Sequence, residues 1–153
     1  MSVAFRRDGD EEHLEPRFEL PIPAGPNLVT ARGLELIDHT ICTLQGDLAT
    51  ATDEAAIASL KRDLRYWQAR RITAELPEPP DGSKVVFGVT AHLLLNGKPK
   101  SLRIVGDDEA DPASGMISFK SPMSQAILGA EVGDVLPFGT AEDAIRVVAV
   151  ELP

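Results

Sequence analysis

A proline cluster at Pro77, Pro79 and Pro80 separates two stretches of the chain whose apolar residues recur with different periods. Before the cluster the spacing is that of helices, and after it the apolar residues follow the pattern of strands. Because proline fixes φ and removes a backbone donor, neither a helix nor a central strand continues through this point. The Asp81-Gly82 pair that follows is typical of a turn, so the sequence predicts a stop and a hinge here.

The stretch before the prolines carries two helical stripes. Their members are Leu34, Ile37, Ile41, Leu44 and Leu48 in the first, and Ile57, Leu60, Leu64 and Trp67 in the second. Thr30 is placed to cap the first helix, which we expect to end near Ala49, and Thr52 or Asp53 is placed to cap the second. At about 1.5 Å per residue, each helix is roughly 30 Å long. The two stripes therefore predict a short antiparallel helical hairpin, a coiled coil.

The stretch after the prolines is predicted to form a sheet with one short helix. The expected strands are residues 84–95, 100–105, 117–119, 135–138 and 144–152. Asn96-Gly97 indicates a β-hairpin between the first two strands, although Lys98 and Pro99 favour a loop longer than two residues. Ser121-Pro122 is typical of an N-cap with a first-turn proline, and it predicts a helix that stops at Gly129. A helix against a mostly antiparallel sheet is an α+β domain.

The segment before the hairpin has a different composition. Residues 1–26 hold six acids, three arginines and four prolines, with few apolar side chains to bury. We expect an extended, flexible tail there, because prolines at this density leave no continuous helix. The predicted organisation is therefore a tail over residues 1–26, a hairpin with its linker over residues 27–80, and an α+β domain over residues 81–153.

Charge and hydropathy narrow the class of protein. The chain of 153 residues carries 15 Lys and Arg against 24 Asp and Glu, a formal net charge of -9. This balance disfavours a protein that grips nucleic acid phosphates over a broad face, so we expect any contact with nucleic acid to run through a protein partner. No apolar run reaches the roughly 20 residues of a membrane span, and residues 1–10 lack the apolar core of a leader peptide. The sequence therefore predicts a cytoplasmic protein with no membrane contact.

Residue types that bind metals or perform chemistry do not form a recognisable motif. The three histidines are far apart, and the single Cys42 has no partner at ligand spacing. Asp107, Glu109 and Asp111 alternate as in a calcium loop, but Pro112 stands where that loop requires glycine. Phosphate-binding and nucleophile motifs are absent from the sequence. We therefore expect no metal, no cofactor and no catalytic residue, which indicates a binding protein and not an enzyme.

The segment from Ile104 to Leu136 resembles the C-terminal domain of the bacterial Gre transcript-cleavage and elongation factors. Its marks, in order, are Ile104-Val105-Gly106, Asp108-Glu109-Ala110-Asp111, Ile117-Ser118, Ser121-Pro122, Ala126-Ile127-Leu128-Gly129 and Val132-Gly133-Asp134. Residues 29–33 are similar to the start of the Gre coiled coil, and residues 85–88 to the family's first strand. The resemblance implies an FKBP-like C-terminal domain, a bent sheet around one short helix, that docks on RNA polymerase near the secondary channel. It also implies a coiled coil that points into that channel.

At the hairpin tip the chain departs from the family pattern. In cleavage-competent members, acidic residues at the tip help to hold a second Mg²⁺ in the polymerase active centre. Gly46-Asp47-Leu48 is similar to the opening of that motif, but Thr50 stands at the position of the companion acid and the hairpin is substantially shorter. The acidic candidates at the tip are Asp47, Asp53 and Glu54. The resemblance implies a regulator of elongation with weak or no stimulation of cleavage.

Candidates for polymerase contact come from the acidic cluster and the short helix of the C-terminal domain. They are Asp107, Asp108, Glu109, Asp111, Ser121, Pro122 and Met123. A solvated polar turn is the alternative for the acids, and packing against the sheet is the alternative for the helix. Two other functions stay open at this point. One is a short-armed factor like the regulator of nucleoside diphosphate kinase, and the other is an FKBP-like peptidyl-prolyl isomerase.

Overall fold

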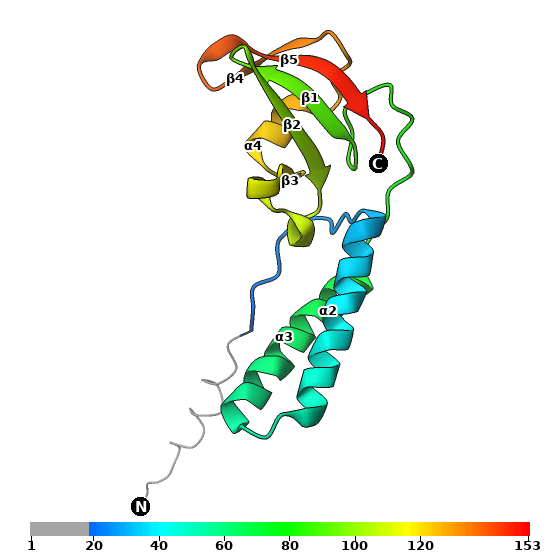
Figure 1. Cartoon of the computed structure of the whole chain (residues 1–153), viewed down its shortest axis with the longest axis vertical. Coiled ribbons are helices and arrows are strands. Elements are labelled where there is room, and N and C mark those ends of the chain that lie inside the picture. Colours follow the sequence, from blue (N-terminus) through cyan, green and yellow to red (C-terminus); the bar gives the residue numbers. More distant parts are fainter. Residues whose placement is uncertain (1–18) are drawn as a thin grey trace, which may run out of the picture. The chain divides into compact units, whose positions relative to one another are not determined.

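The computed structural model describes residues 19–153 of the chain (Figure 1). Most of the expected tail therefore lies outside the described residues. The described chain forms two compact units, one made of residues 19–24 and 37–72 and the other of residues 25–36 and 73–153. Within the described range, none of the helices combines the length and the apolar character that crossing a membrane requires.

Two helices of 20 residues each, α2 (Ala31–Thr50) and α3 (Glu54–Thr73), form the predicted hairpin (Figure 1). Thr30 caps α2, because the Gly33 amide donates a hydrogen bond of 2.9 Å to the Thr30 hydroxyl. Of the two predicted caps for α3, the chain uses Asp53, whose carboxylate accepts the Ala56 amide at 3.0 Å. The caps explain why the helices begin where they do.

The apolar stripes of the hairpin are only partly covered. Ile37 is 1% exposed, whereas the other members of both stripes are half-buried. Two helices alone present one line of contact, so their apolar side chains keep one flank in water. On the exposed flank, Arg71 Nε donates to Asp38 Oδ1 at 2.6 Å and links the two helices.

The C-terminal part contains a five-stranded sheet in the order β3-β2-β1-β5-β4. Its strands are β1 (Thr90–Leu95), β2 (Lys98–Val105), β3 (Met116–Ser118), β4 (Val135–Phe138) and β5 (Ala141–Glu151). Only the β2–β3 pair is parallel, and the other three pairs are antiparallel. One short helix, α4 (Pro122–Ile127), packs against one face of this sheet (Figure 1). The expected α+β domain with a mostly antiparallel sheet is confirmed.

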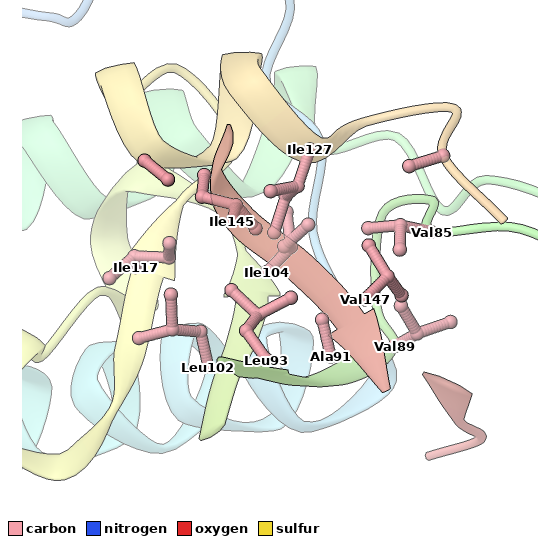
Figure 2. Close-up of a cluster of buried hydrophobic side chains, with 12 residues drawn as sticks. Val85, Val89, Ala91, Leu93, Leu102, Ile104, Ile117, Ile127, Ile145 and Val147 are labelled. Carbon is pink, nitrogen blue, oxygen red and sulfur yellow. The ribbon is translucent and has the colours of Figure 1, made fainter. Parts of the chain in front are cut away.

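The core lies between α4 and the sheet, and it is aliphatic (Figure 2). Its buried members are Val85, Val89, Ala91, Leu93, Leu102, Ile104, Ile117, Ile127, Ala130, Ala144, Ile145 and Val147. Along β1 and β2 these residues alternate with more exposed ones, since successive side chains of a strand point to opposite faces. Ile127 is the member of this buried cluster that comes from α4 (Figure 2), and Met123 and Ala126 of the same helix pack against it in part.

The prediction of one strand over residues 84–95 is wrong in its first half. The strand begins only at Thr90, and Gly88 before it has a φ of +96°. Val85 instead exchanges backbone hydrogen bonds with the end of α4, donating to Ala130 at 2.8 Å and accepting from Gly129 at 2.7 Å. The apolar run of residues 85–89 is therefore core from an irregular segment, which the pattern of apolar residues does not distinguish from a strand.

The expected long loop between the first two strands is also wrong. Leu95 pairs with Lys98, so the connection is the two residues Asn96 and Gly97, with φ values of 51° and 83°. This is the turn that Asn-Gly favours, since both positions need positive φ. Pro99 is tolerated because β3 pairs with β2 only from Arg103 onward, which leaves an open edge for a residue without an amide hydrogen.

The cap predicted for the short helix is confirmed. Ser121 accepts the Ser124 amide at 3.2 Å, and Pro122 occupies the first turn. Ser124 is fully buried and donates its hydroxyl to the Ser118 carbonyl at 2.7 Å, which ties α4 to β3. Gly129 follows the helix with a φ of 89°. The sequence signals for the start and the stop therefore describe the observed helix.

Candidate functional site

The three acidic candidates of the hairpin lie at its tip. Asp47 is in the last turn of α2, Asp53 is in the three-residue turn, and Glu54 opens α3. All three are exposed. The carboxylate of Asp53 already accepts the Ala56 amide, so it is partly committed to capping. Among residues 19–153, no group of three or more His, Cys, Asp or Glu side chains is arranged to hold a metal ion.

Ion pairs engage Arg62, Arg65 and Arg71 of α3. Arg65 donates from Nε and Nη2 to the two carboxylate oxygens of Glu19, at 2.9 and 2.8 Å. These hydrogen bonds, together with the negative charge of Glu19, raise the pKa of Arg65. Arg62 pairs with Asp63 at 2.9 Å. The basic side of this helix is therefore partly neutralised by acids of the same unit.

The acidic cluster after β2 divides into buried and presented carboxylates. Glu109 ends the short 3₁₀ helix η3 (Asp107–Glu109), and its side chain is only 2% exposed. The Thr30 hydroxyl donates to Glu109 Oε1 at 2.6 Å, and Arg32 Nη1 donates to Oε2 at 2.8 Å. This carboxylate therefore holds the start of α2, and its polar atoms are not presented to a partner.

Two glycines allow this close packing. An added Cβ at Gly106 would lie 2.1 Å from the Leu28 carbonyl oxygen, and one at Gly33 would lie 2.8 Å from Glu109 Oε1. Both glycines belong to segments on which the family resemblance rests. The sequence pattern did not predict that these two segments are in contact. Gly106 lets the segment before α2 lie directly against the end of β2, and Gly33 lets the first turn of α2 lie against Glu109.

The remaining acids of the cluster are placed differently. Asp107 accepts the Ser118 hydroxyl at 2.7 Å and pairs with Lys120 at 2.8 Å. Asp111 is exposed and accepts the Ser114 hydroxyl at 2.8 Å, at the start of η4 (Pro112–Ser114). Asp108 is partly exposed. Asp111 is therefore the exposed acid of the cluster, and Asp108 shares the partial exposure of Asp107.

The candidates on α4 are likewise divided between structure and surface. Ser121 serves as the N-cap, and Met123 packs in part against the core cluster. Pro122 is exposed. Structural roles thus account for Ser121 and in part for Met123, whereas Pro122 remains open to a partner.

One constellation escaped the sequence reasoning. His92 lies between Ser101 on β2 and Glu151 on β5, with Nδ1 at 2.7 Å from the Ser101 hydroxyl and Nε2 at 2.7 Å from the Glu151 carboxylate. Only the strand register brings these residues together. The side chains of His92 and Glu151 are 37% and 63% exposed, so they lie on an exposed sheet face, whereas binding and catalytic sites are typically concave pockets. The row is therefore assigned to cross-strand stabilisation.

Comparisons with known proteins match this chain to a single family. Residues 79–152 match the family model described as transcription elongation factor, GreA/GreB, C-term. Transcription elongation factor GreA of Ralstonia nicotianae is 36% identical over 118 residues, which cover 68% of this chain and 74% of that protein. GreA of Thermomicrobium roseum is 31% identical over 104 residues, which cover 68% of this chain and 67% of that protein.

Other similarities are more local or more distant. GreA of Desulfovibrio desulfuricans is 53% identical over 55 residues, and the alignment covers 35% of this chain and 34% of that protein. The chain thus spans about a third of the length of that relative. The crystal structure of GreA factor homolog 1 (Gfh1) of Thermus thermophilus aligns at 22% identity with a TM-score of 0.40, covering 83% of this chain and 99% of that chain.

Proposed function

Because the chain belongs to the GreA/GreB family of transcription elongation factors, we propose that it binds RNA polymerase and regulates elongation from the region of the secondary channel. In this proposal the C-terminal domain is the docking module and the hairpin reaches toward the channel. The chemistry belongs to the polymerase, and the chain contributes no active site of its own. Contact with nucleic acid is indirect, and the place of action is the cytoplasm, where bacterial transcription takes place.

The hairpin tip is the observation that carries the non-cleaving part of the proposal. Each helix has 20 residues and is therefore roughly 30 Å long. At the tip the carboxylate of Asp53 is engaged as a helix cap, and Thr50 stands where the family pattern has an acid. A second Mg²⁺ needs oxygen ligands within about 2.0–2.1 Å. A short arm with this tip is poorly suited to deliver them.

Transcript cleavage in backtracked complexes tests this directly. Purified polymerase, stalled on a backtracked transcript with Mg²⁺, is mixed with this protein or with a full-length GreA. We expect no shortening of the transcript above the polymerase alone, because the tip does not supply the ligands of the second ion. Pre-incubation with this protein is expected to reduce the cleavage that GreA stimulates, since both would occupy the same region.

The tip variants separate the possible results. Asp47→Asn, Asp53→Asn and Glu54→Gln remove charge, and asparagine at position 53 still caps α3. Robust cleavage by the parent chain that disappears in the triple variant would show that the short arm is active after all. Failure of the protein to associate with polymerase in a pull-down would contradict the whole proposal.

The docking surface yields a second prediction. Asp108 is partly exposed beside the exposed Asp111 and is the acid that we assign to polymerase contact. Asp108→Lys is expected to weaken polymerase binding at least tenfold in a titration at fixed ionic strength, because a like charge at an interface costs several kcal/mol. The exposed Asp143 on β5 is the matched control. Asp143→Lys makes the same charge change and is expected to alter affinity less than twofold, and equal losses would place the contact elsewhere.

Two further functions were open from the sequence. A short-armed factor like the regulator of nucleoside diphosphate kinase is the second candidate, and the 20-residue arms favour it. Competition with GreA and an absence of cleavage are expected of that kind of factor as well. The C-terminal motifs distinguish the two candidates, because they fit the Gre factors better. The isomerase reading is less favoured, because the face of the sheet below α4 is occupied by the aliphatic cluster of Figure 2. The chain also has few aromatic residues, 5% in all, to line a proline pocket.

A further inference from the structure

A hollow of about 190 Å³ lies on the C-terminal part, and none of its lining residues belongs to the tip or to α4. The linker after α3 forms one wall and the sheet domain forms the other. Its walls are largely apolar and include Leu76, Pro77, Pro79, Pro80 and Phe87, with Arg103 as the cation. All of these residues belong to one compact unit.

Arg103 is unusual among the residues around this hollow. Its Nε atom is buried and has no hydrogen-bond partner among residues 19–153. Buried donors are nearly always paired, because leaving one without an acceptor costs about 1–3 kcal/mol. That Nε atom has almost no accessible surface, so a ligand in the hollow would not reach it. Arg103 as a whole is half-buried and lines the hollow, and its positive charge beside apolar walls favours an anionic acceptor there.

We propose that this hollow binds a small carboxylate carried on an apolar group, with the carboxylate on Arg103 and the apolar group against Phe87 and the prolines. The volume supports a ligand of about the size of one amino acid, since pockets for drug-sized ligands measure roughly 300–1,000 Å³. The proposal goes beyond a role at the polymerase, because none of the residues assigned to docking or to the tip lines the hollow.

Two neighbouring groups influence such a ligand in opposite ways. Thr30 and Ala31 at the start of α2 line the hollow, and the N-terminus of a helix favours a negative charge. Glu109 already faces this end of the helix, so Arg103 remains the principal partner. Glu78 also lines the hollow, and its carboxylate would repel an anion. Affinity is therefore expected to rise when Glu78 is neutralised.

A titration followed by amide chemical shifts tests the proposal with two matched probes. N-acetyl-L-phenylalanine carries the apolar group and the carboxylate, whereas N-acetyl-L-phenylalaninamide has the same ring without the charge. We expect saturable shifts at Val29, Phe87 and Arg103 with the acid, and at least fivefold weaker binding of the amide. Arg103→Gln is expected to weaken binding of the acid at least fivefold, and Glu78→Gln to strengthen it two- to threefold.

The controls make each outcome decisive. Arg146 is an exposed arginine of β5 that does not line the hollow, so Arg146→Gln should leave the affinity unchanged. Equal binding of acid and amide, insensitivity to Arg103→Gln, or shifts centred on other residues would overturn the proposal. If the amide shifts have not saturated at about 20 millimolar acid, the affinity is too low for a specific site, and this result would overturn the proposal as well. Should Arg103→Gln not fold, the comparison of the two probes and the Glu78→Gln variant still decide the question.

Discussion

Gly106→Ala is expected to lower the free energy of unfolding by about 3 kcal/mol, the upper end of the usual cost of overpacking. The new Cβ would lie 2.1 Å from the Leu28 carbonyl oxygen, which is a backbone atom that no side-chain rotation can move away. The Leu28 segment is itself held in place, because Val29 donates to the Glu75 carbonyl at 2.9 Å and Glu75 donates to Asn27 at 2.9 Å. The clash therefore forces two backbone segments apart. Urea unfolding followed by far-ultraviolet circular dichroism measures the loss.

The matched control for this glycine lies in the hairpin. Gly46 is inside α2, and a Cβ added there meets nothing within 4 Å. Gly46→Ala is expected to stabilise the protein by about 0.5–1 kcal/mol, because alanine is the better helix former. A cost at position 106 no larger than about 1 kcal/mol would mean that the segment before α2 does not pack against the end of β2 as described.

Arg32→Ala is expected to cost about 2–3 kcal/mol. Among residues 19–153, the substitution leaves the buried Glu109 carboxylate with the Thr30 hydroxyl as its one remaining hydrogen-bond partner, at 2.6 Å. Removing one member of a buried ion pair is costly because the other charge stays out of water. We place the value below the usual range for fully buried pairs, since the Arg32 side chain is 47% exposed. Urea unfolding at neutral pH measures it.

The hairpin offers the matched control for this ion pair. Arg71 pairs with Asp38 at 2.6 Å, but both side chains are about half exposed, at 46% and 54%. Arg71→Ala is therefore expected to cost less than about 1 kcal/mol, and salt should reduce that cost further. Equal effects of the two substitutions would show that burial of Glu109 contributes nothing. Glu109→Gln, which keeps the volume and removes the charge, isolates the ionic part in a double-mutant cycle with Arg32→Ala.

These two predictions concern one structural unit, the contact between the residues before α2 and the loop after β2. Thr30 and Gly33 come from one end of the chain, and Gly106 and Glu109 come from a position more than seventy residues later. For the proposed function this contact has a specific consequence. The start of the arm is built into the same compact unit as the proposed docking module. A loss of polymerase binding in these variants would therefore follow from instability and would not identify a contact residue.

The sequence indicated the local structure well wherever a short-range physical rule applies. The two stripes and their capping residues located α2 and α3, and Ser121-Pro122 with Gly129 located α4. The wrong predictions concern segments whose local sequence pattern is compatible with two different structures. The apolar residues 85–89 satisfy the pattern of a strand, but they enter the core from an irregular segment beside Gly88. Pro99 suggested a longer loop because proline is rare inside a paired strand. That Pro99 lies on an open edge of β2 depends on the pairing of the sheet, which the sequence pattern does not show.

The amino-acid sequence by itself determined the helices with their caps, most of the strands, the α+β class and the family resemblance, because periodicity, capping and motif order act over a few residues. Only the tertiary structure decided what the acidic cluster does. Glu109 is buried under the first turn of α2, whereas Asp111 is exposed two residues later. The difference arises from distant segments that come into contact, and burial determines whether a carboxylate stabilises the fold or meets a partner. The hollow beside Arg103 has the same origin, since its walls are far apart in sequence.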